Sequence, residues 1–212
     1  MDSSELFHII IAVLIMGIVV SFNSLLKLNF FALGTAILFS FIIIAINIAA
    51  KKWAAYSLDA DVKHEIWSWS RYGMKPSENL AKPIAAGVIA PLALSVFSIG
   101  ALKCFSLLTY QTSALTRRAA KRFGFYSFTE MTQWHNSLIG AAGIVASLLL
   151  AFIAYFIPGL EGLPKLAAFY AFWNLIPIST LDGTHILFGS KVLYTALAIL
   201  TIIITLATFI IV

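Results

Sequence analysis

The residues of this chain that could do chemistry are concentrated in one stretch, Phe172 to Thr184. Asn174, Pro177, Asp182 and Gly183 interrupt an apolar surrounding with residues that break a helix and expose its backbone. An acid inside an apolar segment is rare and usually faces the protein interior or a cavity. Asp182 is therefore the first functional candidate, as a metal ligand or an ion site, and the alternative is an N-cap of a helix that begins at Gly183.

The spacing of these residues resembles a signature of the site-2 protease family of intramembrane zinc metalloproteases. The shared pattern is Asn-x-x-Pro, at Asn174 and Pro177, followed by a Leu-Asp-Gly that ends at Gly183. In that family the aspartate is the third zinc ligand. A His-Glu-x-x-His motif on an earlier membrane helix supplies the other two ligands and the general base. The resemblance implies that Asp182 occupies the ligand position.

The matching position for the histidine motif lies at the end of the second apolar segment, where the chemistry is missing. Ile46 and Ala50 stand where the two histidines belong, and Asn47 replaces the glutamate. Aliphatic side chains offer no lone pair to a metal, and an amide does not act as a base at ordinary pH. The resemblance therefore implies a degenerate site at which no zinc is expected. Its remnant pocket consists of Asn174, Pro177, Asp182 and Gly183.

An active enzyme would need substitute ligands. Asp182 and His185 are three residues apart and share a helical face, so together with His135 they could form a zinc cluster. The pair His64-Glu65 resembles a damaged motif, but it lies in an alternating pattern that favours a strand. Without a metal, the expected hydrogen-bond neighbours of Asp182 are Asn47, Asn174 and Thr184.

The composition places these residues in a membrane protein. Of the 212 residues, 61% are hydrophobic and 11% are charged, which excludes an ordinary soluble domain. Apolar stretches of about 20 residues, the length that spans a bilayer, cover 5–22, 29–50, 84–108, 136–157, 164–186 and 190–212. We therefore expect an all-α polytopic membrane protein with about six transmembrane segments, the fifth of them broken. We expect residues 1–212 to form a single membrane-embedded domain like that of the site-2 proteases.

Basic residues predict the sidedness of the segments. Lys51 and Lys52 close the second segment, and the loop that follows is the most basic, so it is assigned to the cytoplasm. The next loop is also basic and would therefore also be cytoplasmic. A single span over 84–108 would place these two loops on opposite sides of the membrane, so the two expectations conflict. Pro91 and nearby glycines allow instead a short helix with a re-entrant or extended return. Residues 59–69 alternate like a short strand. The resemblance to the site-2 proteases implies a small sheet at this position, and the two tryptophans of the segment suit a membrane interface.

Three functions follow from these features. The first is a catalytically silent relative of the site-2 proteases, which binds a membrane segment of another protein without cleaving it. The second is an active intramembrane zinc metalloprotease with non-standard ligands, and the third is a small transporter or channel that uses Asp182. All three place the chain in the cell membrane as a multi-pass protein surrounded by lipid. The net charge of +5 is assigned to residues at membrane boundaries and not to nucleic-acid binding, since no binding motif accompanies it.

Overall fold

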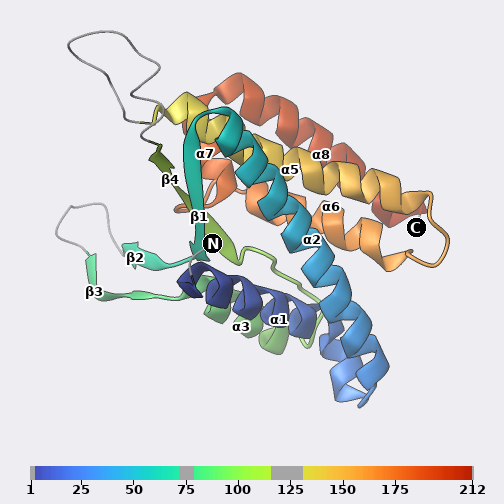
Figure 1. The fold of residues 1–212 in the computed structure, drawn as a ribbon. Helices are drawn as coiled ribbons and strands as arrows, with labels where there is room; N and C mark the ends of the chain where they lie inside the picture. Colours follow the sequence, from blue (N-terminus) through green and yellow to red (C-terminus); the bar gives the residue numbers. More distant parts are fainter. Residues whose placement is uncertain (1–2, 72–78, 116–130, 212) are drawn as a thin grey trace, which may run out of the picture.

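The structure, a computed structural model, describes residues 3–71, 79–115 and 131–211 (Figure 1). Within this part of the chain, four helices are long and apolar enough to cross a membrane, fewer than the six spans expected from the sequence. They are α1 (Ser3–Leu26), α2 (Phe30–Ser57), α5 (Gln133–Tyr155) and α8 (Lys191–Ile211). The side chains of Asn29 and Thr132 cap α2 and α5 by accepting hydrogen bonds from the backbone amides of their first turns.

The apolar segment 84–108 is not a continuous helix, so it does not form one of the six spans counted from the sequence. It contains α3 (Ala86–Phe97), whose 12 residues extend over about 18 Å, too short to cross a bilayer. The chain then turns at Gly100, which has a φ of +75° and packs against Asn23 near the end of α1. After this turn the chain returns without helical structure to the start of β4 (Leu108–Ala114).

The two ends of this hairpin meet at Trp67. The backbone amide of Gly87 donates to Trp67 O at 2.8 Å, and the amide of Trp67 donates to Leu107 O at 2.9 Å. The chain therefore enters and leaves the segment at the same point of the molecule, as the expected short helix with an extended return requires.

The apolar segment 164–186 is broken, as predicted. It forms α6 (Gly162–Leu175) and α7 (Asp182–Gly189), which are joined by a non-helical turn. Pro177 lies in this turn, where it has no amide hydrogen with which to continue the helix. A Cβ added to Gly183 would lie 1.9 Å from the carbonyl oxygen of Leu175. Only glycine therefore lets the start of α7 pack this closely against the end of α6.

Two small antiparallel sheets lie near the N-terminus of α1 (Figure 1). In the first, β1 (Ala60–Ile66) pairs with β4, and His64 lies opposite Tyr110. In the second, β2 (Trp69–Arg71) pairs with β3 (Asn79–Ile84). The predicted alternation holds within β1, where Val62 and His64 are buried. The alternation ends at Trp67, which is buried because the ends of the α3 hairpin close over it.

Small residues determine how closely the helices approach. A Cβ added to Gly17 of α1 would lie 2.6 Å from Ile37 Cγ1 of α2, and from this contact the two helices diverge toward the N-terminus of α1 (Figure 1). On α5, Gly140 packs against Tyr110 and the backbone of Asp182, while Gly143 packs against α2. The C-terminal half of α2, the start of α7 and strand β4 therefore meet on one side of α5.

Candidate functional site

A buried ion pair lies where these elements meet. Lys51 Nζ of α2 is 2.6 Å from Asp182 Oδ2 of α7, and the two side chains are 2% and 0% exposed. A charge removed from water is costly unless a partner compensates it. The acid that the sequence singled out therefore has a partner of opposite charge. This partner is a lysine that the sequence assigned to the membrane boundary.

The stem of Lys51 lies over a glycine of α5. A Cβ added to Gly143 would be 2.5 Å from Lys51 Cε and 3.0 Å from Asn47 Nδ2. Asn47 Nδ2 donates to Ser147 Oγ at 3.1 Å, and Ser147 Oγ donates to Gly143 O at 3.0 Å. The ammonium of Lys51 lies 5.0 Å from the centre of the Tyr110 ring, within the range of a cation–π contact. The small residue on α5 is therefore what makes room for the lysine.

Asp182 is the first residue of α7, but it does not cap that helix. The N-cap is Leu181, and no side chain forms a capping hydrogen bond. The expected N-cap role of Asp182 is therefore wrong, because its carboxylate turns toward Lys51 of another helix.

The hydrogen-bond neighbours expected for Asp182 are also wrong. Asn47 bonds Ser147 of α5, and Asn174 donates to backbone carbonyls. The Thr184 hydroxyl is buried without a hydrogen-bond partner among the described residues. The acid is paired with Lys51, and Asn47 lies beside the stem of that lysine at Gly143.

Asn174 supports the extended return of the α3 hairpin. Its Nδ2 donates to Tyr170 O at 2.9 Å and to Phe105 O at 3.4 Å. Nearby, Ser106 Oγ donates to Trp173 O at 3.2 Å. Buried backbone outside helices and strands needs such hydrogen-bond partners. The asparagine of the Asn-x-x-Pro pattern therefore fixes a neighbouring segment and does not contact the acid.

The face of α2 that meets α5 and α7 carries Asn47 and Lys51. These residues are four apart, which is also the spacing of the two histidines in His-Glu-x-x-His. Ile46 and Ala50, which the resemblance assigns to the histidine positions, are half-buried one position earlier in each case. The side chains that reach the site thus lie one residue later than the resemblance predicts.

The histidines do not assemble a metal site in the described part of the chain. No group of three or more histidine, cysteine, aspartate or glutamate side chains gathers there in an arrangement that could hold a metal. His135 Nδ1 contacts Thr132 Oγ1 at the start of α5, and the His185 ring lies 4.8 Å from the Tyr110 ring centre to centre. The cluster of Asp182, His185 and His135 considered from the sequence is therefore not formed.

A second buried polar cluster joins α1, α2 and β1. The Glu5 carboxylate accepts hydrogen bonds from Lys52 Nζ at 2.8 and 2.9 Å and lies 3.1 Å from His64 Nδ1. Burial, and then the charge of Lys51, lower the pKa of His64 to about 3. The ring is therefore neutral at pH 7 and donates its Nδ1 hydrogen to Glu5.

Sequence reasoning missed both roles of the lysine pair. Successive residues of a helix point about 100° apart, so Lys51 reaches Asp182 while Lys52 reaches Glu5. Two signals were available in the sequence. Lys51 lies four residues after Asn47 on one helical face, and Glu5 is an acid at the start of an apolar helix that needs a partner.

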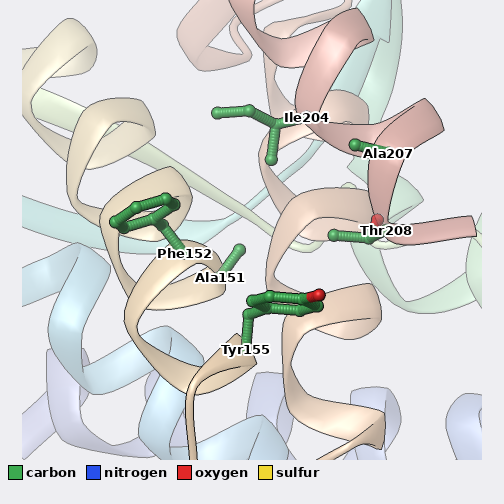
Figure 2. Close-up of a pocket in the computed structure, with 6 residues that line it drawn as sticks. All are labelled: Ala151, Phe152, Tyr155, Ile204, Ala207 and Thr208. Atoms are coloured by element: carbon green, nitrogen blue, oxygen red, sulfur yellow. The ribbon is translucent and has the colours of Figure 1, made fainter. Parts of the chain in front are cut away.

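An apolar groove between α5 and α8 lies apart from this site. Figure 2 shows Phe152 and Tyr155 of α5 on one side of it and Ile204 and Thr208 of α8 on the other. Its lining contains no acid, histidine or lysine, so it offers no chemistry of its own.

Comparisons with models of protein families, with curated proteins and with solved structures find no match to this chain. Function is therefore inferred from the residues of the site and their geometry.

Proposed function

We propose that this chain is a non-catalytic, multi-pass membrane relative of the site-2 proteases that binds a membrane segment of another protein without cleaving it. The observation that carries the proposal is the ion pair of Lys51 and Asp182. The ammonium group supplies the positive charge that a metal would otherwise bring to this acid. It does so without an open coordination position.

Lys51 supplies one positive charge where a zinc ion would supply two, and none of the chemistry of the metal. A catalytic zinc holds a water molecule, lowers the pKa of that water and polarises the carbonyl group of the substrate. A paired ammonium does none of these, and the amide of Asn47 is not a base. The four-residue spacing of Asn47 and Lys51 supports their descent from the two histidines. Ile48, which is buried, then stands in the position of the glutamate.

An unpaired strand edge beside the ion pair supports the binding of an extended segment. Trp67 N donates to Leu107 O, so these two residues form a hydrogen-bonded pair. Because such pairs alternate along an antiparallel ladder, every second residue of β4 points its backbone N–H and C=O groups away from β1. These residues are Leu108, Tyr110, Thr112 and Ala114. Among the described residues no other strand pairs with this edge. Extended peptides add to such edges. Leu108 and Tyr110 are buried, so a peptide would add at the half-buried outer part of the edge, at Thr112 and Ala114.

Restoring the ligands tests the relationship. The variant Asn47→His/Lys51→His places two imidazoles four residues apart against Asp182, so stoichiometric zinc is expected by elemental analysis of the purified protein. The matched control Ile46→His/Ala50→His carries the same residues one position earlier and is expected to bind none. Asp182→Asn in the first background should remove the zinc. Folded but metal-free Asn47→His/Lys51→His protein would overturn the proposed descent.

Binding without cleavage is tested on the natural chain in bicelles. Fluorescent transmembrane peptides with helix-breaking residues at their centre are expected to bind saturably and to stay intact, with or without added zinc. Cleavage that a chelator blocks would establish the alternative of an active metalloprotease with unusual ligands. If no peptide binds saturably, the partner-binding part of the proposal fails.

A second candidate, an ion- or proton-transporting protein, is favoured by polar atoms around the ion pair. Asp182 Oδ1, Thr184 Oγ1 and His185 Nε2 are buried without hydrogen-bond partners among the described residues. They lie at the start of the second half of a broken helix, and transporters use such breaks to hold ions. Proton or cation flux in liposomes that Asp182→Asn abolishes would favour this candidate over the first.

A further inference from the structure

An apolar groove runs along the outward side of α1 and α2, apart from the ion pair and from the groove between α5 and α8. Its walls are α1 from Leu6 to Leu14 and α2 from Phe41 to Ala49, and every lining side chain is a hydrocarbon. The groove exists because the two helices touch at Gly17 and diverge toward the N-terminus of α1 (Figure 1). Ala45 and Ala49 keep it open, since they are the smallest residues of its lining.

The dimensions of the groove fit one acyl chain. From Leu6 to Leu14 the helix rises about 12 Å, which is most of one leaflet of a hydrocarbon core about 30 Å thick. The groove volume is about 340 Å³. This is many times the space that one water-sized group needs, so the groove can hold several methylene groups in a row.

The polar end of the groove suits the headgroup of an anionic phospholipid. Lys52, Trp53 and Tyr56 continue the face of α2 that carries Ala45 and Ala49. Trp53 and Tyr56 are 75% and 64% exposed, as is typical of aromatic residues at a membrane interface.

The charge at this end is also suitable. The side chain of Lys52 is 33% exposed, whereas that of its partner Glu5 is only 5% exposed. The pole of this ion pair that faces outward is therefore the ammonium, which attracts a phosphate.

We propose that this groove binds one acyl chain of an anionic phospholipid, whose phosphate lies at Lys52 between Trp53 and Tyr56. The lipid fills the space that the divergence of α1 and α2 leaves open. The proposal requires that α1 and α2 cross a bilayer, but it is independent of any relationship to the proteases.

The test is native mass spectrometry of delipidated protein to which dioleoyl phosphatidylglycerol is added. The natural chain is expected to retain one lipid at an activation energy that strips the others. Ala45→Phe/Ala49→Phe fills the groove from exposed or half-buried positions and is expected to weaken this binding at least tenfold. The control Ala196→Phe, at an exposed position of α8, should bind like the natural chain. Equal binding by the groove variant and the control would overturn the proposal.

A second measurement separates the contribution of the acyl chains to lipid binding from that of the headgroup, and it does not depend on any protein variant. The natural chain is titrated with phosphatidylglycerol and with phosphatidylcholine that carry the same acyl chains. At least fivefold tighter binding of phosphatidylglycerol is expected. Equal affinity for the two lipids would refute the phosphate site at Lys52, and failure to retain any lipid would refute the groove as a lipid site.

Discussion

Breaking the Lys51–Asp182 pair from one side should strongly destabilise the fold. Lys51→Met leaves the Asp182 carboxylate fully buried without its cation. At an effective dielectric constant of about 20, two unit charges 2.6 Å apart attract by about 6 kcal/mol. Most of this attraction offsets the cost of removing both groups from water. Losing one partner of a buried pair costs about 3–5 kcal/mol, and we expect the free energy of unfolding of Lys51→Met to fall by this amount.

A double-mutant cycle isolates the interaction. Lys51→Met/Asp182→Asn removes both charges and should recover most of the loss, so the coupling between the two sites should be at least about 2 kcal/mol. Unfolding by denaturant in mixed micelles, followed by circular dichroism, measures each variant. Lys191→Met, at an exposed position of α8, should stay within about 0.5 kcal/mol of the natural chain. Additive effects of the two single changes would refute the buried pair.

Two further predictions concern the supports of the site. Gly183→Ala should lower the free energy of unfolding by an amount at the upper end of the about 1–3 kcal/mol typical of overpacking, because its Cβ would meet Leu175 O. The control Gly34→Ala has open space around its Cβ and should stabilise α2 by about 0.5–1 kcal/mol. Equal melting temperatures for the two variants would contradict this packing. Because the pKa of His64 is lowered from 6.5 to about 3, the unfolded chain binds one more proton between these values. The contribution of the neutral His64 to the free energy of unfolding should therefore be fully present above about pH 6.5. It should be lost as the pH drops toward 3, by up to about 1.4 kcal/mol per pH unit. His64→Asn should flatten this dependence in unfolding titrations from pH 7.5 to 5, and an unchanged slope would exclude His64 as its source.

Local sequence signals predicted several elements correctly. Hydropathy over about 20 residues located α1, α2, α5 and α8, because the length and apolar composition of a helix can be read from the sequence alone. Pro177 predicted the break between α6 and α7, since its fixed φ and its missing amide hydrogen act wherever it occurs. The alternation before Trp67 predicted β1, because successive side chains of a strand point to opposite faces of the sheet.

Hydropathy did not decide the path of residues 84–108. A span and a re-entrant hairpin have the same composition, and both avoid charged residues. What distinguishes them is a set of distant contacts: Trp67 bonds both ends of the hairpin, and Asn174 bonds its extended return. None of these contacts leaves a local trace in the sequence.

The sequence by itself determined that an acid lies in a broken apolar helix and that Ile46, Asn47 and Ala50 provide neither a zinc ligand nor a base. Only the tertiary structure decided that the acid pairs with Lys51. An ion pair depends on where two side chains meet in space, and α2 and α7 meet only because Gly143 of α5 leaves room for the lysine stem. The distance between the charges, and with it the Coulomb energy that balances their desolvation, exists only once the helices are packed.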